Sequence, residues 1–214
     1  MMILSERQGF ASDHSSTSYE FMAVDKPLGQ KERAEVSKLS SRVNPTSRRA
    51  NFVYNVDGYD IPGGWENLMA RYYDVMYRED YGWWTLAMAF DATPEQYEVL
   101  AEYAFDEGEE TGIEIAYHED RRIIITINCV IEDYYEDGDE EDYDDESGGN
   151  VFSTDNGLLN ILIQIRQQIM KGNYRALDAV FVKYGDSEEE ISPPSLKNLG
   201  KDDRIIRDFI NMLG

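Results

Sequence analysis

Cysteine and histidine are nearly absent from this chain. One cysteine, Cys129, and two histidines occur in 214 residues. A single thiol cannot form an intramolecular disulfide, and three Cys and His side chains cannot complete a four-ligand zinc site of that type. This usage is typical of proteins in a reducing compartment. We therefore expect a cytoplasmic location.

Long apolar runs are absent as well. Nowhere do about 18 consecutive apolar residues occur, the length that a membrane-spanning helix requires. The first 18 residues also lack a basic segment followed by an apolar one. We expect neither a membrane span nor a secretion signal. Apolar residues nevertheless make up 42% and aromatic residues 12% of the chain, so a packed core is expected.

Basic residues are scarce, with 20 Lys and Arg against 43 Asp and Glu, for a net charge of −23. Eleven of the acids, with no Lys or Arg among them, lie in 132–146, which we call the acid run. In 26–49, by contrast, seven Lys and Arg outweigh two Glu. The molecule is therefore predicted to be electrically lopsided.

Hydrophobic periodicity predicts the elements of the first half. Alternation favours strands over 19–24 and 51–56, with a short helix over 30–41 between them. The next segment, 65–78, is predicted to be an amphipathic helix, because its apolar residues recur at i, i+3, i+4, i+7 and i+11. They are Trp65, Leu68, Met69, Tyr72 and Met76.

The middle of the chain carries clearer local signals. A buried strand is predicted over 84–90. Thr93, Pro94 and Gln96 then announce a helix, as N-cap, first helical residue and capping-box partner. Its apolar face runs to Phe105, and the helix should end before Gly108. Strands over 113–117 and 122–131 are predicted to form a hairpin.

The C-terminal part is predicted to be helical. Helices over 158–169 and 174–184, interrupted by Gly172, form an αα-hairpin. A linker over 186–201 contains Pro193 and Pro194, and a last amphipathic helix covers 202–213. The expected organisation is a disordered tail over 1–18, an α+β domain over 19–131, an acidic loop over 132–150, a helical hairpin over 151–185 packing on that domain, and a linker with the terminal helix over 186–214.

An internal similarity guides the expected fold class. The segments 19–39 and 85–105 both read as a strand, an Asp, a Pro and a helix, each with a further strand downstream. Two β-α-β units predict an α+β fold with a ferredoxin-like sheet and helices on one face. The helix over 65–78 would be an insertion between the two halves.

Several short motifs resemble a group of uncharacterised bacterial proteins. The opening YEF, AVDKPL at 23–28, LSSR at 39–42 with PTS at 45–47, LMARYYD at 68–74 and GNYRAL at 172–177 carry the likeness. It covers most of 19–213, and the long acid run departs from the group's pattern. The genes of such proteins lie near genes for SWIM zinc-finger proteins. This implies a nucleic-acid-related context and assigns no catalytic or binding residue.

Few residues are candidates for catalysis. Asp25 and Asp91 occupy matching places at the ends of two strands, and His118 lies at the mouth of the hairpin. Together they could provide acid/base groups, which is the basis of an alternative prediction, an enzyme of unknown chemistry. Asp before a helix is more commonly a cap or turn residue. Cys129 lies among Ile and Val and is expected to be a buried structural thiol.

The favoured prediction is a non-enzymatic interaction or adaptor protein without a cofactor. The acid run is expected to contact a basic or nucleic-acid-associated protein, although it can also dock on the basic segment 26–49 of its own chain. Direct nucleic-acid binding by 26–49 is disfavoured by the overall charge. The acid run matches the calcium-loop pattern poorly. The terminal helix is the second expected contact element, docking either on its own chain or on a partner. The residues predicted to bind a partner are Glu136, Asp137, Asp139, Glu140, Glu141, Asp142, Ile206, Phe209, Ile210 and Leu213.

Overall fold

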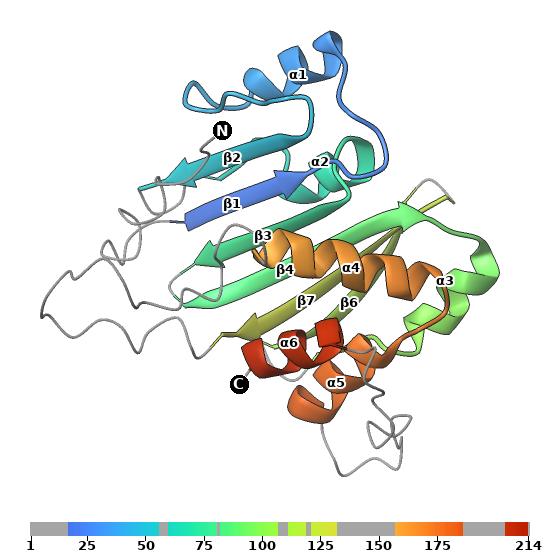
Figure 1. The fold of residues 1–214 in the computed structure, drawn as a ribbon. Coiled ribbons are helices and arrows are strands. Elements are labelled where there is room, and N and C mark those ends of the chain that lie inside the picture. The colour runs from blue at the N-terminus through green and yellow to red at the C-terminus, as the bar shows by residue number, and fades with distance from the viewer. Residues whose placement is uncertain are drawn as a thin grey trace, which may run out of the picture.

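The computed structural model describes residues 17–55, 60–80, 82–106, 111–118, 121–131, 157–185 and 204–213 (Figure 1). The chain is an α+β protein. The strands are β1 (Thr17–Met22), β2 (Arg49–Tyr54), β3 (Val75–Asp80), β4 (Trp83–Asp91), β5 (Phe105–Asp106), β6 (Gly112–His118) and β7 (Arg122–Val130). The helices are α1 (Gln30–Ser37), α2 (Trp65–Arg71), α3 (Pro94–Ala101), α4 (Leu158–Met170), α5 (Arg175–Tyr184) and α6 (Arg204–Met212).

All strands join one sheet in the order β2-β1-β3-β4-β7-β6-β5, in which β5 contributes only two residues. Every neighbouring pair is antiparallel. As a result, β2 and β3 run parallel on either side of β1, and β4 and β6 run parallel on either side of β7. The helix α2 connects the first parallel pair, and α3 lies on the connection between the second. The sheet thus consists of two similar three-stranded groups side by side.

This topology differs from the predicted ferredoxin-like sheet. The first predicted β-α-β unit does not exist, because β1 and β2, which flank α1, are antiparallel neighbours. The repeated pattern of strand, Asp, Pro and helix is local, so it does not determine strand direction. Helices also cover both faces of the sheet rather than one, because the central strands are apolar on both sides and each side must be shielded from water.

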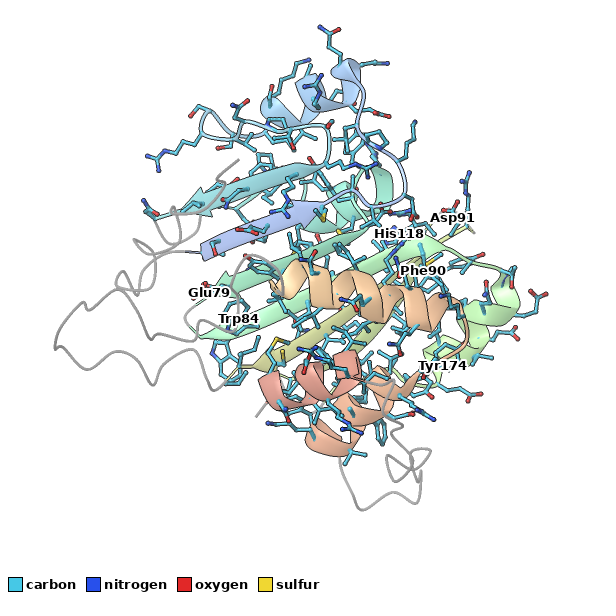
Figure 2. The ribbon with its side chains drawn as sticks, viewed as in Figure 1. Glu79, Trp84, Phe90, Asp91, His118 and Tyr174 are labelled. Carbon is cyan, nitrogen blue, oxygen red and sulfur yellow. The ribbon has the colours of Figure 1, made fainter. Side chains whose placement is uncertain are left out.

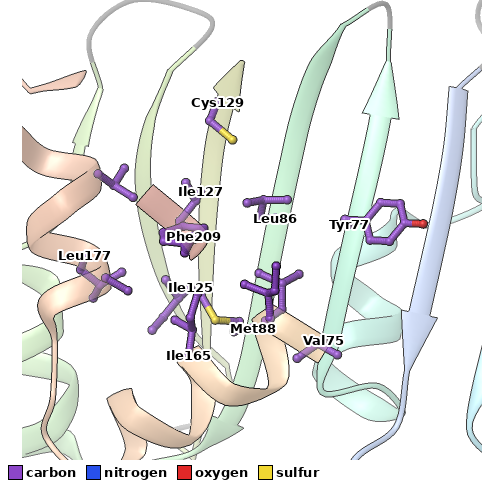
Figure 3. Packing of buried hydrophobic residues seen from close by; sticks show 14 of the residues in the cluster. Val75, Tyr77, Leu86, Met88, Ile125, Ile127, Cys129, Ile165, Leu177 and Phe209 are labelled. Atoms are coloured by element: carbon purple, nitrogen blue, oxygen red, sulfur yellow. The ribbon is translucent and has the colours of Figure 1, made fainter. Parts of the chain in front are cut away.

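Two hydrophobic clusters fill the two faces. The larger contains Leu86, Met88 and Ile125 from the sheet together with residues of α4, α5 and α6 (Figure 3). The other lies beneath α1 and α2 and is rich in aromatic rings, among them Phe21 and Phe52, which contact edge to face at 5.8 Å between ring centroids. Strand alternation explains the division, since successive residues of a strand point to opposite faces.

Several local predictions are confirmed. Gln96 N donates to Thr93 Oγ1 at 3.3 Å and Thr93 N donates to Gln96 Oε1 at 3.0 Å, which completes the predicted capping box of α3. The hairpin of β6 and β7 forms as expected. The αα-hairpin of α4 and α5 also forms, and Gly172 between them has a φ of +81°, a conformation that favours glycine.

The predicted helix over 65–78 is wrong in its second half. The helix α2 ends at Arg71, and β3 begins at Val75. Met76 satisfied the helical spacing by coincidence. In the structure it lies on a strand and still reaches the same cluster as Leu68 and Met69. The β-branched Val75 and the aromatic Tyr77 suit a strand that is buried on both faces better than a helix.

Other element ends differ by smaller amounts. The predicted helix over 30–41 ends at Ser37, and the helix begun at Pro94 ends at Ala101. Phe105, assigned to the apolar face of that helix, instead begins the short edge strand β5. The first two strands begin and end two residues earlier than predicted. The predicted tail over 1–18 is wrong at its last two residues, because Thr17 and Ser18 begin β1. The rest of the tail, the acidic loop over 132–150 and the linker over 186–201 lie outside the described residues.

The terminal helix α6 docks on its own chain. Ile206, Phe209 and Leu213 are buried, and Phe209 belongs to the larger cluster beside residues of α4 and α5. The Lys183 ammonium and the Tyr184 hydroxyl both donate to the main-chain carbonyl of Leu213. The apolar stripe thus finds its surface in cis. No helix in the described ranges is long and apolar enough to cross a membrane.

Candidate site at the carboxylate end of the sheet

Three aspartates gather at one end of the sheet. Asp25 follows β1, Asp74 precedes β3, and Asp91 is the last residue of β4. Because the neighbouring strands are antiparallel, the end of β1, the start of β3 and the end of β4 lie on the same side of the sheet, across the strand ends. The sequence predicted a role for Asp25 and Asp91, and the structure adds Asp74 between them.

Asp74 is the centre of this arrangement and is only 5% exposed. Its Oδ2 accepts hydrogen bonds from the main-chain N–H groups of Val24 and Asp25, at 2.7 and 2.9 Å. Its Oδ1 accepts from Arg122 Nη2 at 2.8 Å and lies 3.6 Å from Arg166 Nη2. Both oxygens therefore have strong donors, which allows a carboxylate to be buried there.

Arg166 approaches from the face covered by α4 and is 1% exposed. Its Nε donates to the carbonyl of Ala89 at 2.7 Å, while Nη1 and Nη2 each donate to a different oxygen of Asp25. A bidentate pair of this kind fixes the relative orientation of the two side chains and also pairs their charges. Arg166 thereby ties α4 both to β4 and to the loop that follows β1.

Arg122 approaches from the opposite face, which α2 covers. Its Nε donates to the carbonyl of Met69 at 2.8 Å and its Nη2 to that of Tyr73 at 2.7 Å. The guanidinium thus binds carbonyls at the C-terminal end of α2, where a positive charge is favoured. On the outside, Arg121 Nε donates to Asp91 at 2.9 Å, and this hydrogen bond raises the pKa of Arg121.

A cleft of about 320 Å³ opens over these groups. Both acidic and basic side chains line it, and each of the three aspartates is within 4 Å of an arginine nitrogen. The lining residues are Asp25, Lys26, Pro27, Leu28, Glu32, Arg71, Tyr72, Asp74, Asp91, Arg121, Arg122 and Met170. The three aspartates are thus engaged with arginines of α4, of β7 and of the turn before β7, and these pairs fasten the elements to one another.

His118 is not brought into this cleft. In the sheet register Asp91 lies opposite Arg122, and Arg122 lies opposite His118. The strand β7, which carries Arg122, therefore separates the predicted imidazole from the predicted carboxylate. Asp91 and His118 are labelled in Figure 2. The structure unites two members of the predicted catalytic trio and leaves the third two strands away.

The remaining candidates in the described part offer little reactive chemistry. Cys129 is fully buried, and desolvation raises the pKa of its thiol to about 12. Its thiolate, the nucleophilic form, is therefore scarce near neutral pH. Within the same residues, no three His, Cys, Asp or Glu side chains gather as a set of metal ligands.

The predicted partner-binding residues divide into two groups. Ile206, Phe209 and Leu213 are buried within the chain itself, and Ile210 is half-buried, so this stripe is not offered to a partner in the structure. The acids Glu136, Asp137, Asp139, Glu140, Glu141 and Asp142 lie outside the described residues.

Sequence reasoning missed Asp74 and Arg166. Asp74 had been placed inside the helix that continued too far. Arg166, however, leaves a visible signal, because it follows Ile165 and lies four residues after Leu162 on the apolar stripe of α4. A charged residue on a buried helical face requires a buried partner of opposite charge. That reasoning could have predicted an aspartate beside α4.

Comparisons with known proteins add no second source of evidence. No family model, curated protein or solved structure matches this chain. The resemblance to a group of uncharacterised bacterial proteins stays a prediction.

Proposed function

We propose that this chain is a non-enzymatic interaction protein that binds a basic partner through its acid run. The observation that supports it best is the internal pairing of the cleft carboxylates. Asp25, Asp74 and Asp91 are held by Arg166, Arg122 and Arg121. Those charges are paired within the fold, whereas the acid run contains eleven acids and no Lys or Arg.

The placement of the acid run in the fold agrees with this function. It lies between β7 and α4, and the residues that flank the segment, Ile131 and Leu158, are both buried in the larger cluster. The core thus holds both ends of a 26-residue segment. The acid run therefore joins the described core at two fixed points, which sets where on the molecule a partner would bind.

Electrostatics favours a partner with clustered Lys and Arg. Like charges along the acid run raise the local negative potential, which accelerates encounter with a basic surface and is weakened by salt. The favourable free energy comes from many weak pairs rather than from one buried contact. The complex should therefore be fast to form and sensitive to ionic strength.

The test is a titration of the full chain with a fluorescent twelve-residue oligolysine peptide. Glu140→Gln, Glu141→Gln and Asp142→Asn together should weaken binding about tenfold at low salt, as charges are lost from the contact. A matched control changes Glu66, Glu98 and Glu102, three exposed acids elsewhere, to Gln. The control should change affinity less than about twofold. Equal losses in the two triple variants would contradict the proposal, because net charge alone would then explain binding.

A catalytic or ligand-binding cleft is the second candidate, because Asp25 and Asp91 do line one cleft. Its test is a thermal-shift screen of small molecules with the wild type and with Asp91→Asn. A compound that stabilises only the wild type would support this candidate. If no compound separates the two proteins, the cleft is structural.

A further inference from the structure

A second charged region lies beside β2, an edge strand of the sheet. We define the basic edge as the side chains of Lys31, Lys38, Arg42 and Arg49, all of them exposed. Lys31 and Lys38 are seven residues apart, two turns along the same face in a helical register, and the segment containing Arg42 connects α1 to β2. In Figure 1 this region lies at the edge of the molecule remote from α5 and α6.

The three acids of the segment 25–35 are engaged with other groups of the chain. Asp25 is held by Arg166, and Glu32 accepts from the main-chain N–H of Gly29. Glu35 accepts from the Tyr72 hydroxyl at 2.6 Å, and this hydrogen bond lowers the pKa of its carboxyl. The negative charges in this segment thus have local partners.

The basic side chains are arranged differently. Among the described residues, Lys31, Lys38, Arg42 and Arg49 form no side-chain hydrogen bond or ion pair. Lys31 and Lys38 act on Glu35 only as more distant charges. Their scaffold is anchored, because Val36 of α1 is buried in the cluster beneath it together with Leu28 and Val43. An anchored segment whose positive side chains have no ion-pair partner among the described residues is suited to bind an anionic chain.

The sheet register places the basic edge within reach of the acid run. Val130, two residues before the run, lies in the same cross-strand row as Tyr54 at the end of β2. Four strand spacings, roughly 19 Å, separate them. Arg49 lies five residues back along β2, roughly 17 Å in the direction perpendicular to that row, so that roughly 25 Å separate it from Val130. Ten extended residues span roughly 33 Å, so the middle of the run reaches the edge. The twelve residues after Glu146 can span roughly 40 Å in returning to α4.

We propose that the basic edge is the docking surface for the acid run of the same chain. This contact competes with the basic partner, so the inference rests on the proposed function and adds its regulation. A tethered segment is present at an effective concentration of the order of millimolar, which makes a weak internal contact effective. An external partner must displace the basic edge from the acid run. Its apparent affinity is therefore reduced when only a small fraction of the molecules have a free acid run.

Charge favours this occupant over a nucleic acid. The chain has a net charge of −23, so it repels a separate polyanion at long range. The acid run is covalently attached and does not have to approach against that repulsion. A second copy of the chain would also meet that repulsion. Both remain measurable outcomes of the test.

The test compares affinities for the same oligolysine peptide. Lys31→Ala, Lys38→Ala and Arg42→Ala together should tighten binding about fivefold at low salt, because releasing an internal competitor raises the competent fraction. The control changes Lys171, Arg204 and Arg207, also exposed, to Ala. It alters net charge by the same amount and should tighten binding less than about twofold.

Four outcomes decide the matter. Tighter binding confined to the basic-edge variant supports internal docking. Equal effects of the basic-edge variant and the control overturn internal docking but leave the proposed function intact. The proposed function fails if the acid-run variant binds oligolysine as well as wild type does. A salt-sensitive dimer of wild type that the basic-edge variant lacks would show docking between copies and overturn the internal contact. Binding of a single-stranded oligonucleotide by wild type, lost in the basic-edge variant, would assign the edge to nucleic acid.

Discussion

The two ends of the sheet treat negative charge in opposite ways. At one end, Asp25, Asp74 and Asp91 are each met by an arginine, and two of those arginines reach in from opposite faces. From the other end, after β7, the chain enters an acid run with no Lys or Arg of its own. Acids that the fold requires are paired one by one, and the surplus is concentrated in one segment.

This difference separates stability from recognition. A buried carboxylate must be matched by donors or it destabilises the fold. Solvated acids cost little and act at a distance until salt screens them. Substitutions at the paired end should therefore change the free energy of unfolding, and those in the acid run should change binding instead.

The largest effect is expected at Asp74. Asp74→Ala removes the shared acceptor of Arg122 and Arg166 and leaves two largely buried guanidinium groups with one partner fewer. Breaking a buried pair typically costs about 3 to 5 kcal/mol. Urea unfolding measures the change. Asp91→Ala, at a half-exposed pair, serves as the control and should cost less than about 1 kcal/mol. Similar costs at both positions would remove the distinction between buried and exposed pairs.

A comparable loss is expected at Phe209, which lies in the larger core cluster and is fully buried. Phe209→Ala should cost about 3 to 5 kcal/mol through lost burial and the cavity left behind. Val182 of α5 is exposed, so Val182→Ala provides a matched truncation with little cost. If Phe209→Ala left stability unchanged but removed binding of a partner, α6 would act in trans.

A smaller, pH-dependent gain is expected at Asp178. Its side chain is 2% exposed, burial raises the pKa of its carboxyl, and Oδ1 has no hydrogen-bond partner. A raised pKa in the folded state means that stability falls as pH rises above the unfolded value of about 3.9. Asp178→Asn should therefore stabilise the protein by about 1 kcal/mol at pH 7, and the gain should vanish near pH 4. A pH-independent difference between the two proteins would refute the role of ionisation.

The smallest effect on stability is expected from the acid run. Changing all eleven acids to their amides should leave the melting temperature within a few degrees of wild type, because mutual repulsion among exposed charges is weak and screened. Calorimetry at low and high salt measures this. Loss of the cooperative transition would mean that the run belongs to the fold.

Local signals predicted local structure well. Thr93, Pro94 and Gln96 specify the start of a helix through contacts within four residues, and Gly172 supplies the turn between two helices. Strand direction was not predictable from such signals, because it depends on pairings between residues far apart in the chain. The overlong helix shows the same limit, since spacing alone could not distinguish Met76 on a strand from Met76 on a helix.

The candidate site was predictable only in part. Asp25 and Asp91 were recognised as equivalent ends of two strands, and they do share a cleft. Their role depends on Arg166, which is 141 residues from Asp25 in sequence, and no local pattern contains that pairing. A charged residue on the apolar face of α4 was the one sign that a buried anion was needed.

The division between paired acids in the fold and the acid run is tested most directly by amide hydrogen exchange of the full chain, with and without saturating oligolysine peptide. Exchange in 132–146 should slow on binding, while amides near Asp25, Asp74 and Asp91 keep their rates, because the paired end of the sheet takes no part in recognition. Protection that appears at the cleft and is absent from the acid run would contradict the division of charge between fold and function.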